Sequence, residues 1–348
     1  MALKPVAEQV MVVMGASSGI GREVALRAAR AGARVVVAAR DEEALASLVD
    51  EIEQAGGRAL FTVADVADFE QVRSVAGRAS ARYGGLDTWV HCSAVALYSR
   101  FEDTTPEEFR RVVEVNLLGQ VHGAMAALPW LRERGQGALV HVSSIEARRA
   151  FPYHSAYSAA KHGIDGFLEA LRIELHQEGV PISVTNVMPG STNTPLFEKA
   201  RTKLGVKPMP IPPIYQPGTV ADLILHAAEH PARDLVAGGA GGALLFTQRV
   251  SPRILDAALL RFGFRTQRTQ EPANDDDNLY RPVRGDHRSE GPFNALGRSA
   301  FNWVDTHAPW RAVSARRIGP RRWHDSSEPG NDRPAPPSPE PVPVGPER

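Results

Sequence analysis

The stretch Met14-Gly15-Ala16-Ser17-Ser18-Gly19-Ile20-Gly21 decides the fold of this chain, because it joins a short apolar run to an amphipathic segment. Three closely spaced glycines let the backbone turn tightly and approach a negatively charged group, which the N-terminus of a helix stabilises. Tight turns alone also select glycine, but the order of strand, turn and helix is typical of a dinucleotide site. The residues that we expect to contact the pyrophosphate are Gly15, Ser17, Ser18, Gly19, Ile20 and Gly21.

Outward from this turn, apolar runs alternate with amphipathic segments up to about residue 240. The runs that we predict to be strands buried on both faces are 10–14, 34–39, 59–63, 88–91, 138–142 and 182–187. We predict a short last strand at 235–237. The segments that we predict to be helices are 21–31, 42–55, 69–83, 106–132, 157–178 and 217–229. This alternation predicts an α/β fold with a doubly wound parallel sheet, a Rossmann fold, as a single domain over residues 1–240 with a C-terminal extension.

The C-terminal region differs in composition from this domain. Residues 241–270 are amphipathic, and we expect a helical extension that packs on the body or on a second subunit, in preference to lying on a membrane surface. Of the 27 prolines, 13 lie in residues 271–348, which show no regular periodicity. Such a segment cannot bury enough apolar surface to offset the entropy of ordering, so we predict a mostly disordered, Pro-rich tail.

Composition excludes several classes of function. The formal net charge is zero, which provides no electrostatic attraction to nucleic acid or to anionic lipid. The single cysteine, Cys92, excludes an intramolecular disulfide and a cysteine-based zinc site, so we predict no metal centre. The sequence shows no signal-peptide pattern and no run of eighteen apolar residues. We therefore expect a cytoplasmic protein.

The residue that ends the second strand bears on the choice of dinucleotide. An acid there would accept hydrogen bonds from the ribose 2′-hydroxyl of NAD, but the strand ends in Ala39-Arg40. The Arg40 guanidinium can pair with a 2′-phosphate, so NADP(H) is favoured over NAD(H). Asp41 keeps NAD open, although it also suits the N-cap of the next helix. Asp65 and Val66 end the third strand, where an adenine would lie, and Asp65 could equally be a cap or turn residue.

Four further residues stand out in the second half of the domain. Tyr157 and Lys161 lie one helical turn apart on the same face of a predicted helix. Ser144 stands thirteen residues before Tyr157, at the end of the fifth strand, and Asn116 interrupts an otherwise apolar helical segment.

With these residues in order, the chain resembles the classical short-chain dehydrogenases/reductases over residues 10–194, and the resemblance implies a fold that extends to about residue 239. The resemblance implies a catalytic tetrad of Asn116, Ser144, Tyr157 and Lys161. It also implies that Pro189, Gly190 and Thr194 hold the nicotinamide carboxamide, and that the protein forms homo-oligomers. The implied reaction is hydride transfer between a nicotinamide and a carbonyl or alcohol.

The chemistry of the residues agrees with this resemblance. A carbonyl that receives a hydride becomes an alkoxide and needs a proton, which Tyr157 can supply. A tyrosine has an ordinary pKa of about 10, and we expect the Lys161 ammonium to lower it. Ser144 can hydrogen-bond the substrate oxygen. Asn116 can hold a water that connects Lys161 to solvent, or it can bond backbone groups at a helix irregularity.

One segment departs from the family pattern. Where most members carry Asn-Asn-Ala-Gly after the fourth strand, this chain has His91-Cys92-Ser93-Ala94. Ala94 in place of glycine would be strained if its φ had to be positive, which would weaken cofactor binding. This departure motivates the alternative of a non-catalytic, dinucleotide-binding regulator or scaffold.

The loop after Thr194 points to the substrate. It is rich in proline and carries Phe197, Met209, Ile211 and Ile214, which predict either an apolar pocket for a hydrophobic carbonyl or alcohol, or simple packing on the body. We expect Tyr153 to form a wall of this pocket. A third alternative, a peripheral membrane enzyme that reduces lipid carbonyls, rests on the amphipathic segment 243–264.

Overall fold

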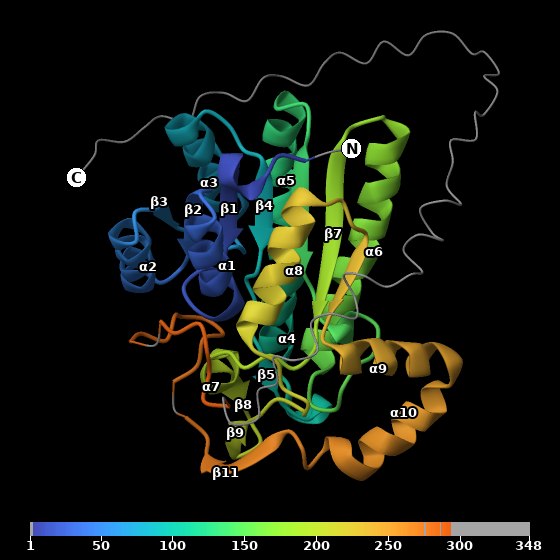
Figure 1. The fold of residues 1–348 in the computed structure, drawn as a ribbon. Helices are drawn as coiled ribbons and strands as arrows, with labels where there is room; N and C mark the ends of the chain where they lie inside the picture. Colours follow the sequence, from blue (N-terminus) through green and yellow to red (C-terminus); the bar gives the residue numbers. More distant parts are fainter. Residues whose placement is uncertain (1–2, 275, 286, 294–348) are drawn as a thin grey trace, which may run out of the picture.

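The predicted strands form one seven-stranded parallel sheet, in the order β10-β7-β6-β4-β1-β2-β3 (Figure 1). The computed structural model describes residues 3–293 apart from 275 and 286. The strands are β1 (Val10–Met14), β2 (Arg34–Ala39), β3 (Arg58–Val63), β4 (Thr88–His91), β6 (Gly137–Val142), β7 (Ile182–Pro189) and β10 (Asp234–Ala237). The doubly wound α/β prediction is confirmed. The strand order reverses between β1 and β4, and open sheets bind ligands at the carboxyl ends of the strands beside such a reversal.

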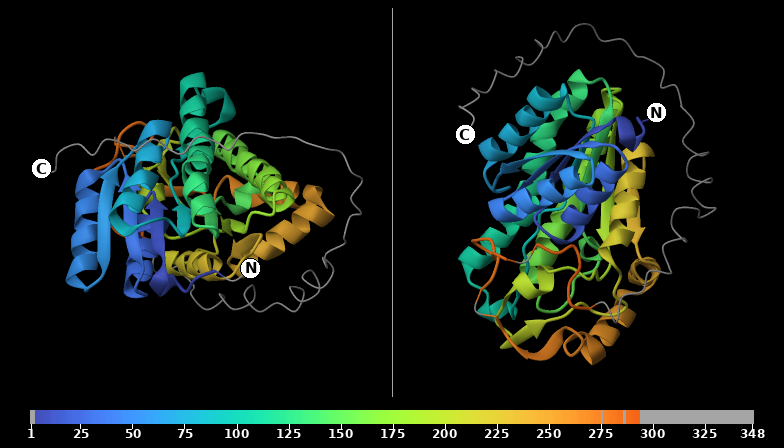
Figure 2. Two further views of the ribbon diagram at one scale, coloured as in Figure 1. Left: turned by 90° about the horizontal axis from the view of Figure 1, so that it is seen from above. Right: turned by 60° about the vertical axis from the view of Figure 1, so that its left-hand side comes forward.

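Helices cover both faces of the sheet, as the two hydrophobic core clusters show (Figure 2). One face carries α1 (Gly19–Arg30), α2 (Glu42–Gln54) and α8 (Pro217–Glu229). The other face carries α3 (Phe69–Tyr83), α4 (Pro106–Val113), α5 (Gly119–Glu133) and α6 (Ser155–Gln177). Strands β1, β4 and β6 are continuous apolar runs because their side chains are buried on both faces. Strand β3 lies at the edge of the sheet and is only partly buried, so the prediction of burial on both faces is wrong for it.

The helix starts follow the local sequence signals. The Asp41 carboxylate accepts a hydrogen bond from the Ala44 amide at 3.1 Å and begins α2. Thr105 and Glu108 form the predicted capping box at the start of α4. Each such cap satisfies amide groups that would otherwise lack partners, and is worth about 1 kcal/mol.

The predicted helix 106–132 is interrupted. A π-helical segment, η3 (Glu114–Leu118), separates α4 from α5 and contains Asn116. Single-turn π-helical irregularities are frequent at functional sites, where they shift the register of the residues that follow.

The C-terminal extension contains α9 (Gly239–Val250), α10 (Pro252–Ala258), the π-helical turn η5 (Leu259–Gly263) and β11 (Arg268–Pro272). Much of its apolar surface faces solvent and does not pack on the body. The exposed large apolar side chains of the extension are Phe246, Val250, Ile254, Leu260, Phe262 and Phe264. In the described part of the chain, no helix combines the length and hydropathy that a bilayer crossing requires.

Packed structure continues beyond residue 270. β11 pairs antiparallel with β9 (Val206–Pro208), and Leu279 is fully buried in the second core cluster. The proline content predicts disorder from residue 271, and the structure differs from this prediction at these packed residues. The reason is local: a single apolar side chain can hold a polar segment on the body. The rest of the predicted tail, residues 294–348, lies outside the described residues.

Short elements complete the region between β7 and α8. They are α7 (Leu196–Lys199), β8 (Arg201–Thr202) and β9, and β8 pairs with β5 (Leu97–Tyr98). These pairings place the loop after Thr194 over the carboxyl ends of the central strands (Figure 1).

Candidate functional site

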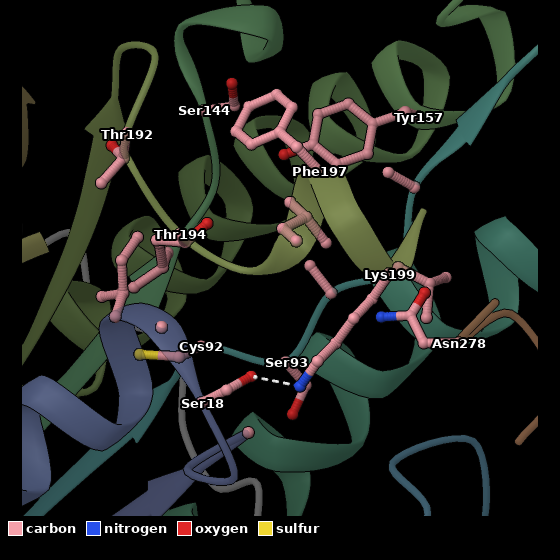
Figure 3. A pocket seen from close by; sticks show the side chains of 18 of the residues that line it. Ser18, Cys92, Ser93, Ser144, Tyr157, Thr192, Thr194, Phe197, Lys199 and Asn278 are labelled. Carbon is pink, nitrogen blue, oxygen red and sulfur yellow. Dashed lines mark hydrogen bonds between the residues drawn. The ribbon is translucent and has the colours of Figure 1, made fainter. Parts of the chain in front are cut away.

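A continuous groove runs along the carboxyl ends of the central strands. It is lined by the glycine-rich turn after β1, the ends of β2, β3, β4 and β6, the start of α6, and the loop after β7. Every residue predicted to act in catalysis or to bind the cofactor, except Asn116, lines this groove. In Figure 3, Ser18 and Cys92 lie at one end and Ser144 and Tyr157 at the other, with Thr194 between them.

The glycine-rich turn needs its glycines. Gly15 has a φ of +80°, and a Cβ on it would lie 2.6 Å from the backbone of Ser93. A Cβ on Gly21 would collide with the Gly15 carbonyl oxygen, and one on Gly19 would lie 3.2 Å from the Thr194 Cβ. The turn therefore forms a cradle without side chains, a shape that accepts a pyrophosphate at the N-terminus of α1.

The family departure after β4 does not distort this cradle. Ala94 has no positive φ; among the described residues other than glycine, only Tyr153 does, at +69°. The strain expected at Ala94 is therefore absent from the structure. Burial raises the pKa of the Cys92 thiol to about 12, so Cys92 is a neutral thiol.

Arg40 and Asp65 lie where the groove passes the carboxyl ends of β2 and β3. The Arg40 Nη2 donates to the Asn278 carbonyl oxygen at 2.6 Å, while its Nη1 is buried without a hydrogen-bond partner. Asp65 accepts from the Ala67 amide at 3.0 Å and pairs with Arg111 at 2.6 Å. Burial acts to raise the pKa of Asp65, but these two partners hold it below its usual value. The carboxylate of Asp65 thus serves the local structure, and Arg40 keeps a free donor that fits an anionic group.

At the other end, Tyr157 and Lys161 share one face of α6. The Lys161 Nζ lies 5.4 Å from the centre of the Tyr157 ring and donates to the Val142 carbonyl oxygen at 3.0 Å. Lys161 is only 1% exposed, and this burial lowers its pKa to about 8. The pair therefore has the predicted arrangement, with an ammonium fixed by the end of β6.

The pKa of Tyr157 departs from the expected direction. Burial and the nearby Glu146 carboxylate raise it, and a hydrogen bond with Ser144 opposes them only in part. In the protein alone, Tyr157 is thus a phenol that holds its proton. The expected lowering would require further positive charge beside the ring, which an oxidised nicotinamide carries.

Glu146 is a buried acid that the sequence analysis missed. Its Oε1 accepts from His154 Nδ1 at 2.8 Å and its Oε2 accepts from the Ser158 hydroxyl at 2.6 Å. Its backbone amide donates to the Ser144 Oγ at 3.1 Å, which orients that hydroxyl. Glu146 follows Ser144 by only two residues, but an isolated acid after a strand gives no signal that it is buried.

Asn116 makes two hydrogen bonds to the backbone of one residue. Its Oδ1 accepts from the Val95 amide at 2.8 Å, and its Nδ2 donates to the Val95 carbonyl oxygen at 2.8 Å. Asn116 is fully buried. This is the predicted bonding at a helix irregularity, and it fixes the segment that follows β4.

The apolar side chains of the loop after Thr194 have two different surroundings. Phe197, Met209 and Ile211 line the groove, whereas Ile214 is fully buried in the body, so both expected outcomes occur. Tyr153 does not line the groove as predicted; its ring packs edge-on against Phe264 at 5.3 Å.

Lys199 is a further groove residue that the sequence analysis did not identify. It is 7% exposed, and its Nζ donates to the Ser18 hydroxyl at 3.3 Å (Figure 3). A buried ammonium beside the glycine-rich turn favours an anionic ligand there. The position of Lys199 depends on the short helix α7, which no periodic pattern in the sequence predicts. Within the described residues, no group of three or more His, Cys, Asp or Glu side chains is arranged to hold a metal ion.

Comparisons with known proteins agree with this geometry. The family model described as short chain dehydrogenase matches residues 9–205. The chain is similar to an uncharacterized oxidoreductase, YxnA, of Bacillus subtilis, with 39% identity over 78% of this chain and 77% of that protein. It is 34% identical to a 3beta-hydroxysteroid dehydrogenase of Mediterraneibacter gnavus, over 56% of this chain and 69% of that protein. Among solved structures, an alcohol dehydrogenase of Thermococcus sibiricus complexed with 5-hydroxy-NADP shares 25% identity and a TM-score of 0.57, over 65% of this chain and 94% of that one.

Proposed function

The chain belongs to the short-chain dehydrogenase/reductase family and is an oxidoreductase that acts on CH–OH and C=O groups, and we propose that it is an NADP(H)-dependent reductase of a hydrophobic carbonyl compound with Tyr157 as its proton donor. The observation that carries the proposal is the juxtaposition of Ser144, Tyr157 and Lys161 at one end of the groove. A small molecule is the substrate class of such an enzyme, and nothing in the comparisons indicates a nucleic-acid partner.

The residues of the groove divide the chemistry between them. The cofactor, when bound, supplies or accepts the hydride at the substrate carbon. Ser144 holds the substrate oxygen and stabilises the charge that develops on it. Tyr157 donates the proton that converts this oxygen to a hydroxyl, and a raised pKa keeps that proton in place until it is needed. Lys161 supplies a fixed positive charge beside the phenol, and Asn116 acts as a positioning residue through Val95.

The proposed cofactor contacts extend along the rest of the groove. The glycine-rich turn holds the pyrophosphate, and Pro189, Gly190 and Thr194 contact the nicotinamide end. Val66 and Asp65 border the adenine. The preference for NADP(H) over NAD(H) is supported by the buried, unpartnered Nη1 of Arg40.

The substrate preference rests on the loop after Thr194. Phe197, Met209 and Ile211 provide apolar walls, which favours a bulky hydrophobic substrate. Glu146 and His154 add a buried polar pair to the lining, so a second polar group on the substrate would also find a partner.

Assembly and location complete the proposal. Exposed apolar side chains on neighbouring helices, Leu118, Met125 and Ile173, support a homo-oligomer formed through these helix faces. A single cysteine supports the reducing cytoplasm as the working compartment. A scaffold without activity is not favoured, because the named relatives are oxidoreductases.

The test is the substitution Tyr157→Phe, assayed with NADPH and a panel of hydrophobic aldehydes and ketones. Loss of a general acid costs about 10²–10⁴-fold in rate, so we expect turnover to fall by that factor while NADPH binding, followed by fluorescence titration, is retained. The matched control is Tyr153→Phe, which lies four residues earlier, before the start of α6, and outside the groove; this variant should keep its activity. Full activity in Tyr157→Phe would refute the role of Tyr157.

A further inference from the structure

The chain beyond β11 returns to the groove. Residues 277–285 and 287–293, here called the strap, run past the glycine-rich turn and α7. In Figure 1 the strap is the orange-red segment that follows β11. Asn278, Pro282 and Val283 line the same groove as Gly15 and Arg40. A segment that the sequence assigns to a disordered tail therefore forms part of the wall at the adenosine end.

The first part of the strap is held by several independent contacts. The Asn278 amide donates to the Lys199 carbonyl oxygen at 2.8 Å, and Asp277 pairs with Arg201 at 2.8 Å. The side chain of Leu279 is fully buried, and its carbonyl oxygen accepts from Arg111 at 3.2 Å. Backbone, ionic and apolar contacts thus converge on three consecutive residues, which fixes them beside the groove.

The second part of the strap reaches the glycine-rich turn. The Gly19 amide donates to the Arg288 carbonyl oxygen at 3.0 Å, and the Gly291 amide donates to the Asn193 carbonyl oxygen at 3.1 Å. The Arg288 guanidinium also pairs with Glu198 at 2.7 Å. The strap therefore connects the turn after β1 with the loop after β7.

Between these anchors, two buried polar atoms of residues that line this end of the groove are left without hydrogen-bond partners. Arg40 is held through its Nη2 by the Asn278 carbonyl oxygen at 2.6 Å, and its Nη1 is buried and unpaired. The side-chain oxygen of Asn278 is also buried and unpaired. A buried donor or acceptor without a partner costs about 1–3 kcal/mol, so two of them lining one groove indicate a ligand that satisfies both.

We propose that the strap is the outer wall of the adenosine site, and that Asn278 is a cofactor-binding residue that also aims Arg40 at the 2′-phosphate. This inference rests on the proposed function, because it assigns the ligand of the groove as NADP(H). The Arg40 Nη1 donates to a phosphate oxygen, and the Asn278 side-chain oxygen accepts from an N–H or O–H of the adenosine. The strap must detach for the cofactor to leave, so its anchors set the dissociation rate.

The test compares strap variants with wild-type enzyme in stopped-flow displacement of NADPH. Asp277→Ala removes the ion pair with Arg201, and Asn278→Ala removes the unpaired side chain but keeps the backbone bond to Arg40. We expect NADPH to dissociate about tenfold faster from each, because a hydrogen bond to a charged group or within a buried site is worth about 1.4 kcal/mol. Arg284→Ala is the control, since Arg284 is exposed on the strap and does not line the groove.

Hydrogen exchange gives an independent reading in unaltered enzyme. Saturating NADPH should slow exchange of the amides of residues 277–285, because closure of the strap over the cofactor reduces its opening. If Asp277→Ala does not fold, Asn278→Ala and the exchange measurement carry the test. Wild-type dissociation rates in the folded strap variants, or strap exchange that NADPH leaves unchanged, would overturn the inference.

Failure of the proposed function would look different. A wild-type protein that binds no nicotinamide dinucleotide would overturn both proposals. Tight NADPH binding that the strap variants leave unchanged would overturn the strap alone. Rapid NADPH loss from the strap variants together with full activity of Tyr157→Phe would support the strap and overturn the catalytic assignment.

Discussion

The two ends of the groove are built in different ways. At the catalytic end, Ser144, Tyr157 and Lys161 lie within eighteen residues of sequence and come from the end of β6 and one face of α6. At the adenosine end, the Arg40 guanidinium is held by the carbonyl oxygen of Asn278, 238 residues away. The proposed catalytic chemistry thus depends on local spacing along a rigid helix, whereas the proposed cofactor choice depends on a contact between distant parts of the chain.

This difference has a physical consequence for each end. A helix fixes the separation of residues one turn apart, so the Tyr157–Lys161 geometry follows directly from their spacing. The position of Arg40 depends on whether the strap is closed, so cofactor affinity is coupled to a local opening equilibrium. Substitutions at the catalytic end should therefore change kcat, and those at the adenosine end should change cofactor affinity.

Among the substitutions that test this difference between the two ends of the groove, Ser144→Ala is expected to have the largest effect. Loss of one hydrogen-bond donor to a developing oxyanion costs about 10²–10³-fold in kcat. The adjacent Ser143 donates to the Asn186 side chain in the core, so Ser143→Ala should lower stability by about 1 kcal/mol and leave kcat largely intact. Steady-state kinetics and urea unfolding of both variants separate the roles. A greater loss of kcat in Ser143→Ala would reverse the assignment.

Lys161→Met should change how stability depends on pH. Burial lowers the pKa of Lys161 from 10.5 to about 8, so between these values the unfolded chain binds more protons than the folded protein. Wild-type stability should therefore gain a contribution as pH rises through this window, on the order of 3 kcal/mol, that the variant lacks. Urea unfolding at pH 7 and pH 10, without cofactor, measures it. Lys207→Met, which removes a solvent-facing ion pair with Glu271, is the control. Parallel pH dependences in wild type and Lys161→Met would contradict the prediction.

The sequence predicts most of the fold because its signals are local. Seven apolar runs became the seven strands, and Thr105 with Glu108 formed the expected capping box. The backbone conformation at Ala94 was harder to predict, because the family pattern suggests a positive φ that the structure does not have.

The parts that the sequence did not predict depend on long-range contacts. Asn278 lies in a polar, acidic segment, and only the single buried Leu279 beside it reveals that the segment packs. Lys199 reaches the groove because β8 and β9 pair with distant strands, which a local pattern cannot show. Glu146 is buried by His154 and Ser158, which approach it from the next element.

Arg40→Ala is the direct test at the adenosine end. Loss of a charge-assisted hydrogen bond to a phosphate costs about 1.5–3 kcal/mol, so NADPH should bind about ten- to a hundredfold more weakly. NADH lacks the 2′-phosphate and should lose little affinity, while kcat at saturating NADPH should remain near that of wild type. Fluorescence titration with both cofactors measures the change. Equal losses for NADPH and NADH would show that Arg40 does not discriminate between them, and the contrast between the two ends would fail.

The smallest expected effect concerns Ala94, which lies between the two ends of the groove. Ala94→Gly restores the residue of the family pattern, and it would stabilise the protein if the alanine were strained. Because Ala94 has no positive φ, glycine gains no strain relief here and only adds conformational freedom to the unfolded chain. We therefore expect a loss of about 0.5–1 kcal/mol in the free energy of unfolding, with NADPH affinity unchanged. Urea unfolding and NADPH titration measure the two quantities, and Ala96→Gly, two residues further along the same segment, is the control. A gain in stability or in NADPH affinity for Ala94→Gly, but not for Ala96→Gly, would mean that the segment after β4 is strained. The middle of the groove, like its adenosine end, would then be shaped by contacts that the local sequence does not show.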